Sequence, residues 1–535
     1  MSAAAPGAPA FGGAASAPRR RSGVSAALAG AVRAVPAAAW ACAIVALANG
    51  LAWSLIVPPF QVPDENAHYA YVQQVAERGT LPHEVQPEGP VSPREDAVLA
   101  SLLTFGITGH RGNPAPFTQL QQDVIDAEVR KNLSARGDGD ALTATGNPPV
   151  YYVLQAVPYK LTPSGKVLDK LAVMRWLSAL MGAATVLLVF MFLRELLPGT
   201  RWAWTTGALM VAFQPLFGFI SGGVNNDNLL YTMAAGVLFG IARAFRRGLT
   251  PRRGLVIGAF LGVGLVTKLT LIAFVPATAV ALVLLVWRAP SRSRGEPGSA
   301  ADEAPSPESA DLPARDVARR GAFVAAAVAL APVALYLLLN HFVWNRVAVP
   351  GGVGGVASGT TGHTFSLREE ISHVWQLWLP RLWMRPQFTY SPLWETWFRG
   401  FVGRFGWLDY DFPGWVYQVA RVITLTVVAF AFAELVRRRD ALRRRAGELA
   451  VYVLAVAGLC AEIGIQSYRE LVSTGGVFEQ PRYVLSLLPL YAALVALATR
   501  VGGRRLGPAI GAALVVLAIG HDLYAQAITI ARYYA

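Results

Sequence analysis

The sequence predicts an all-α polytopic membrane protein, a bundle of about eleven transmembrane helices, and three observations support this. Hydrophobic residues make up 54% of the 535 residues and charged residues only 15%, whereas soluble domains carry roughly a quarter charged residues. Apolar runs of about 20 residues, long enough to cross a bilayer, recur along the chain. Arginine clusters separate alternate runs, as is typical of segments kept on the cytoplasmic side.

The apolar runs predict membrane spans at about residues 36–57, 171–193, 202–220, 226–243, 254–268, 270–288, 320–344, 414–436, 447–465, 482–499 and 507–528. With these spans the arginine clusters fall on one side of the membrane, at Arg19–Arg21, Arg194 and Arg201, Arg243–Arg253, Arg288–Arg294, Arg319 and Arg320, Arg437–Arg445, and Arg500–Arg505. The positive-inside rule then predicts a cytoplasmic N-terminus and an external C-terminus.

One apolar run, the 34 residues from Gly254 to Trp287, allows two interpretations. A single helix would place Arg252 and Arg288 on opposite sides of the membrane. Two short helices that meet near Thr267–Thr270 keep both arginines on the cytoplasmic side, as the positive-inside rule requires. We therefore expect two short spans.

The spans divide the chain into two transmembrane modules, residues 36–288 and residues 320–535. A low-complexity linker at residues 289–319 joins them, and an Ala/Gly/Pro/Ser-rich tail at residues 1–35 precedes them. Such compositions do not bury enough apolar surface to fold. We expect both segments to be disordered and cytoplasmic.

Two large loops are predicted on the external side. The first, residues 58–170, is expected to carry interfacial helices at Asp64–Arg78, Pro93–Phe105, Thr118–Ala135 and Val150–Leu161. The last of these is apolar but too short to cross a bilayer. The second loop, residues 345–413, is rich in tryptophan, which favours the head-group layer of the membrane.

Charge and cysteine content exclude some functions. The net charge of +14 comes from 47 Lys and Arg against 33 Asp and Glu. In a membrane protein this excess indicates cytoplasmic anchoring and contact with membrane lipids. No nucleic-acid-binding motif accompanies it, so we expect no nucleic acid partner. Cys42 and Cys460 both lie in apolar runs, which argues against a structural disulfide.

The candidate catalytic residues are Asp64, Glu65 and His68, which come directly after the first span. Charged groups at that depth are costly unless they are hydrated, paired or bound, so they indicate chemistry on a head group beside the bilayer. A carboxylate there can act as a general base. Alternatively, Asp64 only caps the following helix and Glu65 is only structural. For His68 we expect an orienting hydrogen bond to Asp64.

Six further polar residues are predicted on the same external face: Asn226, Asp227, Lys268, Arg404, Arg482 and Tyr483. Cations can hold a phosphate and stabilise it as it leaves, so this set is a candidate for binding substrate or lipid phosphate. Ordinary alternatives exist. Asn226 and Asp227 can cap a helix, Lys268 can extend from a helix end to the interface, and the arginines of the second loop can meet lipid head groups.

A metal site is left open by these residues. His68 with a carboxylate would need a third ligand to hold a metal ion. Asp227 is the only candidate for that ligand in the set.

Four short motifs resemble the bacterial membrane-protein family known as domain of unknown function 2142. They are Pro63–His68, Val224–Asp227, Phe405–Asp409 and Pro481–Tyr483. More broadly, residues 36–500 are similar to the GT-C glycosyltransferases, in which an acidic motif also opens the first outer loop. The stretch Asn147–Tyr152 looks like a motif of that superfamily too.

This resemblance implies a GT-C-like bundle in the bacterial plasma membrane. It implies an enzyme that moves a sugar, hexosyl or pentosyl, from a polyprenyl-phosphate carrier to an external envelope glycan, lipid or protein, with inversion. Asp64 would then be the base, and Lys268 or Arg482 would hold the departing lipid phosphate. Some relatives use a divalent metal such as Mg²⁺ or Mn²⁺ and others do not, so the resemblance leaves the metal open.

Two other functions stay open at this point. A transporter or flippase of lipid-linked saccharides would carry charges near the bilayer centre and have related halves, and the sequence indicates neither. A non-catalytic protein of envelope assembly would use the acidic motif only as a helix cap.

Overall fold

The computed structural model describes residues 34–82, 91–104, 118–136, 144–290, 312–344, 365–380, 391–475 and 479–535. The predicted tail at residues 1–35, including Arg19–Arg21, and the predicted linker at residues 289–319 lie largely outside the described residues.

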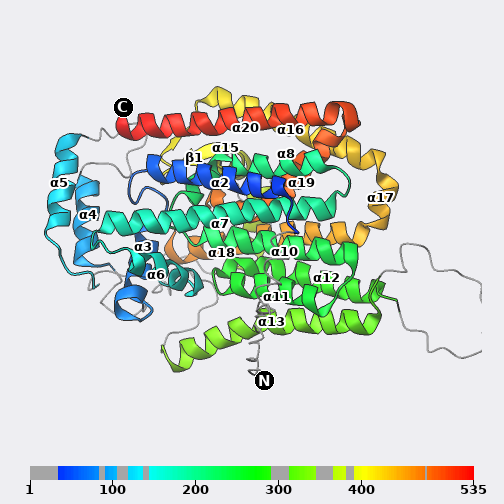
Figure 1. Ribbon diagram of the computed structural model, residues 1–535, viewed down its shortest axis with the longest axis horizontal. Coiled ribbons are helices and arrows are strands. Elements are labelled where there is room, and N and C mark those ends of the chain that lie inside the picture. The colour runs from blue at the N-terminus through cyan, green and yellow to red at the C-terminus, as the bar shows by residue number, and fades with distance from the viewer. Residues whose placement is uncertain are drawn as a thin grey trace, which may run out of the picture.

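Long helices that run side by side make up most of the molecule (Figure 1). In the described ranges, nine helices are long and apolar enough to cross a membrane, which confirms an all-α polytopic membrane protein. These are α2 (Ala37–Ile56), α7 (Val167–Leu196), α10 (Asp227–Arg247), η1 with α12 (Leu269–Arg288), α13 (Arg315–Phe342), α16 (Gly414–Arg437), α18 (Ala446–Thr474), η3 with α19 (Pro481–Arg500) and α20 (Gly503–Tyr534).

The span predicted at residues 202–220 is broken. It consists of α8 (Arg201–Ala212) and α9 (Pro215–Ser221), whose axes differ by 62°. Pro215 lacks a backbone N–H and favours the first position of a helix, and the Gln214 side chain accepts a hydrogen bond from the backbone N–H of Phe217. The predicted span therefore consists of two helices that meet at a bend. Counted as a broken span, the pair raises the number of spans described to ten.

The long apolar run before Trp287 forms two helices, as predicted. α11 (Pro251–Leu265) ends before η1 (Leu269–Phe274), which continues into α12 (Val275–Arg288). The Arg288 guanidinium lies 5.8 Å from the ring centroid of Phe245, at the end of α10 that leads into α11. Both ends of the helix pair therefore lie at one end of the bundle. With 15 residues, α11 is about 22 Å long, below spanning length.

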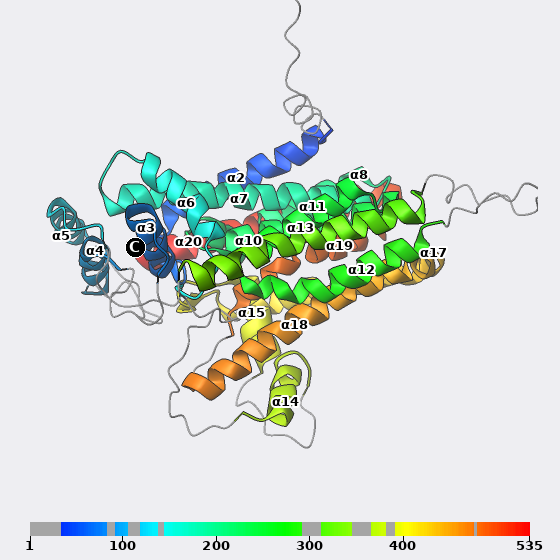
Figure 2. The same cartoon turned by 90° about the horizontal axis from the view of Figure 1, so that it is seen from below.

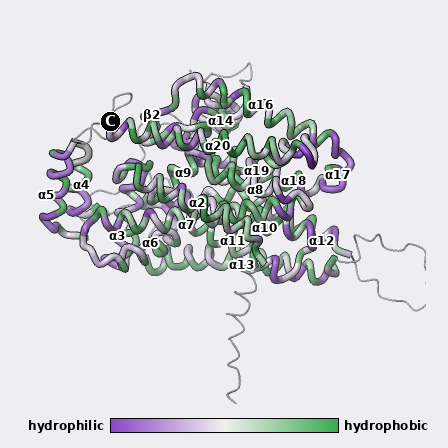
Figure 3. Tube along the Cα trace, turned by 45° about the horizontal axis from the view of Figure 1, so that its top comes forward, coloured by the Kyte–Doolittle hydropathy of each residue, from purple (hydrophilic) through white to green (hydrophobic). Residues whose placement is uncertain are grey.

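The first predicted external loop contains all four expected helices, α3 (Glu65–Arg78), α4 (Pro93–Thr104), α5 (Gln119–Arg130) and α6 (Val150–Leu161). α5 begins with a capping box between Thr118 and Gln121. Figures 1 and 2 show these helices at one end of the bundle and α17 (Arg439–Arg444) at the other. Figure 3 shows hydrophilic residues gathered in α5 and α17, beyond the hydrophobic helices between them.

The described part of the second loop contains α14 (Leu367–Trp378), η2 (Leu393–Phe398), α15 (Arg399–Gly403) and a small hairpin. In the hairpin, β1 (Arg404–Phe405) pairs antiparallel with β2 (Tyr410–Asp411). Trp53 of α2 stacks on Phe405, with ring centroids 5.7 Å apart. The hairpin therefore packs near the end of α2, where the first loop begins.

The site is positioned by α2, α7 and α10, which lie side by side in the bundle core (Figure 1). Trp53 of α2, Phe190 of α7 and Leu238 of α10 are fully buried there. Arg175, near the start of α7, donates to the carbonyl oxygen of Ser54 at the end of α2. The segments after α2 and before α10 consequently meet at the same end of the bundle.

Candidate active site

Four charged side chains from distant segments meet at the end of the bundle that carries α3 and α6. Arg482, in η3 (Pro481–Leu487), donates through Nη2 to Asp64 Oδ2, and its Nε lies 3.4 Å from Asp227 Oδ2. Lys268, just before η1, places Nζ 2.6 Å from Asp227 Oδ1. Asp64, Arg482, Asp227 and Lys268 thus alternate in charge, and we call them the ionic cluster.

The ionic cluster is closed on one side and accessible on the other. The side chains of Asp227 and Arg482 are 0% and 5% exposed, whereas those of Lys268 and Asp64 are 16% and 24% exposed. Buried charges need counter-charges, and here two anions balance two cations. Asp64 and Lys268 are the members that a substrate can reach most directly.

Asp64 directs its carboxylate toward Arg482 and not toward the helix that it precedes. Its φ of +62° lies in the left-handed region, which is uncommon for residues other than glycine. Its side chain makes no capping hydrogen bond to α3. The hypothesis that Asp64 only caps this helix is therefore wrong. Arg482 Nη1 and Asn225 Nδ2 both donate to the carbonyl oxygen of Pro63, at 3.1 and 2.9 Å, and hold this turn.

The surrounding charges keep Asp64 ionised. Burial by itself would raise the pKa of this carboxyl group, but the nearby charge of Arg482, with a smaller effect from Lys268, lowers the pKa below its ordinary value. The site therefore presents a carboxylate that can accept a hydrogen bond from a substrate hydroxyl.

His68 lies one turn into α3 and faces α6. Its Nδ1 is 3.0 Å from the hydroxyl oxygen of Tyr152, and the two rings stack with centroids 5.8 Å apart. The expected hydrogen bond from His68 to Asp64 was wrong, because among the described residues the bond goes to Tyr152. Burial, opposed by the charge of Asp64, lowers the pKa of His68 to about 3. The imidazole is therefore neutral at physiological pH.

Glu65 is fully buried and its carboxylate is fully occupied. Arg175 binds both oxygens, with Nε 2.8 Å from Oε1 and Nη2 2.5 Å from Oε2. The backbone N–H groups of Phe60 and Val224 donate to the same two oxygens, each at 2.9 Å. Glu65 thereby joins α3, α7 and the segment before α10.

Arg175 is a residue of the site that the sequence analysis missed. Besides binding Glu65, it donates to the carbonyl oxygens of Ser54, Val57 and Pro58, at 2.7–3.0 Å. All five of its N–H donors are therefore used. A signal was present, because an arginine inside a predicted apolar span needs a partner or a function.

Tyr152 was also missed as a site residue, although it belongs to the noted stretch Asn147–Tyr152. It stacks on Tyr71 with ring centroids 3.6 Å apart, and Tyr71 donates to the carbonyl oxygen of Asn147 at 3.1 Å. The stretch thus packs on α3 and brings Tyr152 against His68.

The segment before α10 approaches the turn after α2 closely. A Cβ atom at Gly223 would lie 2.4 Å from Val62, so this approach requires glycine. Asn225 Oδ1 accepts a hydrogen bond from the backbone N–H of Asp227 at 2.9 Å, whereas Asn226, at the N-cap position of α10, makes no side-chain capping bond. Asn226 is fully buried, and neither of its side-chain amide atoms has a hydrogen-bond partner within the described chain.

Tyr483 adjoins the ionic cluster, whereas Arg404 belongs to another network. Lys268 Nζ lies 5.0 Å from the ring centroid of Tyr483, within cation–π range. Arg404 is 3.9 Å from Asp411, which Arg399 binds at 2.7 Å. The described contacts of Arg404 do not connect it to the ionic cluster.

The ionic cluster as it stands does not fit a metal ion. The described residues contain no group of three Asp, Glu, His or Cys side chains that could hold one. Asp64 and Asp227 both pair with the Arg482 guanidinium, which takes the position a divalent ion would need between the two carboxylates. Divalent ions of this kind require several oxygen ligands.

Comparison with known proteins gives the family. The model of a family described as predicted membrane protein (DUF2142) matches residues 47–491. The chain belongs to this family. Among curated proteins no match was found for this DUF2142 protein.

Among solved structures, the DUF2142 protein is similar to the oligosaccharyltransferase of Archaeoglobus fulgidus. The apo form has 12% identity and a TM-score of 0.39 over 93% of this chain and 56% of that chain. AglB of the same organism, in complex with an inhibitory peptide and a dolichol-phosphate, has 12% identity and a TM-score of 0.41 over the same shares. The DUF2142 protein thus spans little more than half the length of these structures.

Proposed function

We propose that this protein is an integral membrane glycosyltransferase of the GT-C type. It moves a sugar from a polyprenyl-phosphate carrier to a hydroxyl acceptor outside the plasma membrane, with inversion, and Asp64 is the general base. The observation that carries this proposal is the ionic cluster itself. A partly exposed carboxylate adjoins two cations suited to a phosphate, so a base and a leaving-group site lie together.

Donor binding activates the base in this proposal. Before a donor arrives, Arg482 pairs with Asp64 and Asp227, and Lys268 pairs with Asp227. A donor phosphate competes with these carboxylates for the same N–H donors. As Arg482 turns to the phosphate, Asp64 loses the charge that lowers its pKa and becomes a stronger base.

The reaction then proceeds as a single displacement. Asp64 takes the proton of the acceptor hydroxyl while the acceptor oxygen bonds to the anomeric carbon. The bond from that carbon to the phosphate oxygen breaks, and its electron pair leaves with the lipid phosphate. Lys268 and Arg482 stabilise the charge that develops there. Attack on the side opposite the leaving group inverts the anomeric centre.

Neighbouring residues position these groups. We assign the free amide of Asn226 to a hydroxyl of the donor sugar, because a buried amide without a partner costs free energy unless a ligand satisfies it. Tyr483 lines the phosphate site. Neutral His68 with Tyr152 supports the wall beside Asp64, and Glu65 is a positioning residue because its oxygens are already occupied.

The test is the Asp64→Asn variant, assayed in cells for the envelope glycan and in nanodiscs for release of polyprenyl phosphate from a sugar donor. We expect a loss of about 100-fold or more. Glu77→Gln, on the helix that Asp64 precedes and in a partly exposed ion pair with Lys160, is the matched control and should keep activity. Normal glycan in cells that express Asp64→Asn at the usual level would overturn the proposal.

A further inference from the structure

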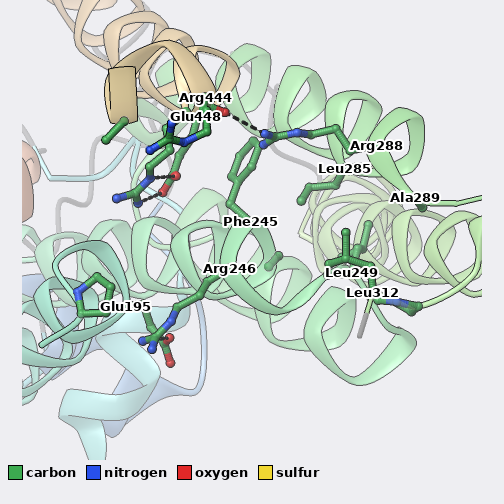
Figure 4. Close-up of a pocket in the computed structure, with 16 residues that line it drawn as sticks. Glu195, Phe245, Arg246, Leu249, Leu285, Arg288, Ala289, Leu312, Arg444 and Glu448 are labelled. Carbon is green, nitrogen blue, oxygen red and sulfur yellow. Dashed lines mark hydrogen bonds and ion pairs between the residues drawn. The ribbon is translucent and has the colours of Figure 1, made fainter. Parts of the chain in front are cut away.

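A second polar cavity lies at the end of the bundle opposite the ionic cluster (Figure 4). α10 connects the two sites, since it begins with Asp227 and carries Arg246 in its last turn, roughly 28 Å away along the helix axis. The cavity has a volume of about 650 Å³ and is formed by α7, α10, α12, α17 and α18 with Leu312 and Pro313. We call it the arginine cavity.

Positive charge predominates in the wall of the arginine cavity, which contains Glu195, Arg246, Arg288, Arg444, Arg445 and Glu448. The charge of Arg445 is balanced by Glu448, because Arg445 Nε and Nη2 lie 2.8 and 3.0 Å from the two carboxylate oxygens of Glu448. Glu195, by contrast, faces three guanidinium groups, those of Arg243, Arg246 and Arg247, at 4.0, 3.1 and 3.3 Å.

Arg288 and Arg444 add positive charge without an acidic partner in the part of the chain that the structure describes. Arg288 Nη2 donates to the main-chain carbonyl of Arg444 at 2.9 Å, and its guanidinium lies over the Phe245 ring. Figure 4 shows Phe245 between the group containing Arg444 and Glu448 and the group containing Arg246 and Glu195. Arg288 and Arg444 are 156 positions apart in the sequence, and the fold brings them into contact at this cavity.

Stabilising the end of a helix is an ordinary role for arginine, and it accounts for only some of the arginines in this wall. Arg445 donates to the carbonyl oxygen of Leu196 at 2.7 Å and Arg246 to that of Arg194 at 3.2 Å, so both stabilise the C-terminal end of α7. Arg288 and Arg444 do not bind that helix end. They border a cavity that also has an apolar side, formed by Phe245, Leu249, Leu285 and Leu312.

We propose that the arginine cavity binds a phosphate ester, with Arg288 and Arg444 on the phosphate and the apolar side against its organic substituent. Guanidinium groups match phosphate oxygens in charge and in geometry, and the wall has more arginines than its two glutamates balance. The head group of an anionic membrane phospholipid and a soluble phosphate compound share this chemistry. The inference does not depend on the function proposed for the ionic cluster.

The test measures binding to the full chain in phosphatidylcholine nanodiscs by native mass spectrometry. One arm adds phosphatidic acid to the nanodiscs and the other adds inorganic phosphate to the solution. The Arg288→Gln/Arg444→Gln variant is compared with Arg439→Gln/Arg443→Gln, which removes two exposed arginines of α17 outside the cavity. We expect saturable binding that weakens about tenfold or more in the first variant and less than about twofold in the second.

The two arms of the experiment identify the source of the phosphate ester. Saturation by phosphatidic acid alone indicates a membrane lipid, and saturation by inorganic phosphate indicates a soluble ligand. If the double variant does not fold, Arg444→Gln alone replaces it, since that side chain is exposed. Arg482→Gln removes a cation of the phosphate site proposed at the ionic cluster, so the saturable binding that remains in this variant is that of the arginine cavity. Three results would overturn the proposal: no saturable binding of either probe, equal weakening in both double variants, or loss of binding in Arg482→Gln only.

Discussion

Arg482 donates a hydrogen bond to Asp64 across 418 positions of sequence. The same guanidinium donates to the carbonyl oxygen of Pro63 and lies 3.4 Å from Asp227. One side chain from η3 therefore completes a site whose carboxylates both come from the first half of the chain. A planar guanidinium can contact several acceptors at once, which an ammonium cannot do in the same geometry.

Arg482→Lys should weaken binding of polyprenyl phosphate by about tenfold or more. Lysine keeps the charge, but loss of one charge-assisted hydrogen bond costs roughly 1.5–3 kcal/mol. Binding can be measured on purified protein in nanodiscs by native mass spectrometry. Arg404→Lys is the control and should change the affinity by less than about twofold, because Arg404 pairs with Asp411. Similar losses in both variants would contradict the assignment.

Asn226→Ala should lower transferase activity without lowering stability. The Asn226 amide is buried and unpaired within the described chain, so its removal leaves no protein group unsatisfied. Asn228 is the matched control, because its Nδ2 donates to the carbonyl oxygens of Ile220 and Gly223. Asn228→Ala should therefore destabilise the protein by roughly 1–3 kcal/mol. Thermal unfolding and donor turnover measure the two effects, and a large loss of stability in Asn226→Ala would argue against a ligand role.

Glu65→Gln should destabilise the fold by roughly 3–5 kcal/mol, because it leaves the Arg175 guanidinium buried beside a neutral partner. Denaturant unfolding in detergent measures this loss. The control is Asp316→Asn, whose partner Arg319 is 3.9 Å away in a largely exposed pair, and it should change stability by less than about 0.5 kcal/mol. A Glu65→Gln variant with normal stability but no activity would make Glu65 a reacting group instead.

His68 should make the protein less stable in mild acid. Its pKa is about 3 in the folded protein and about 6.5 in an unfolded chain, so between these values only the unfolded state binds this proton. Stability therefore falls as the pH drops, by roughly 1.4 kcal/mol per pH unit in the middle of that window. The charged groups that influence His68 are Asp64, Lys268, Arg482 and Asp227.

The measurement for His68 is the stability difference between His68→Gln and wild type at pH 6 and pH 4. This difference should shift by roughly 2–3 kcal/mol in favour of the variant at the lower pH. Asp64 is present in both proteins, so its contribution cancels in this difference. Its lowered pKa in the folded state stabilises the fold at neutral pH, and that stabilisation begins to be lost below about pH 5. If the stabilities of His68→Gln and wild type changed by the same amount between pH 6 and pH 4, the prediction would be contradicted.

The predicted membrane orientation can be tested by labelling single cysteines in a background with Cys42 and Cys460 replaced by alanine. Lys131→Cys lies at the end of α5 and Asp440→Cys on α17, at opposite ends of the bundle (Figure 1). In intact cells a membrane-impermeant maleimide should label the first and not the second. The reverse pattern would place the ionic cluster in the cytoplasm.

Local features of the sequence predicted most of the long helices and grouped polar residues of one face. Apolar length predicted the membrane helices, because burial in lipid requires a length and composition that any window of sequence displays. The four short helices of the first loop also lie where they were expected. Arginine spacing correctly predicted that α11 and α12 return to one end of the bundle. The same reasoning grouped Asp64, Asp227, Lys268 and Arg482, which the structure brings into contact.

Tertiary structure decided which partner each charge takes. Asp64 pairs with Arg482, Glu65 with Arg175 and His68 with Tyr152, and these choices depend on how helices far apart in sequence pack at one end of the bundle. The sequence by itself predicted which polar groups lie beyond the ends of the apolar helices, because hydrophobic length marks where a span ends. Only packing determined which carboxylate is neutralised by a buried arginine and which one stays accessible to a substrate, because pairing needs distances of a few ångströms that sequence spacing does not specify.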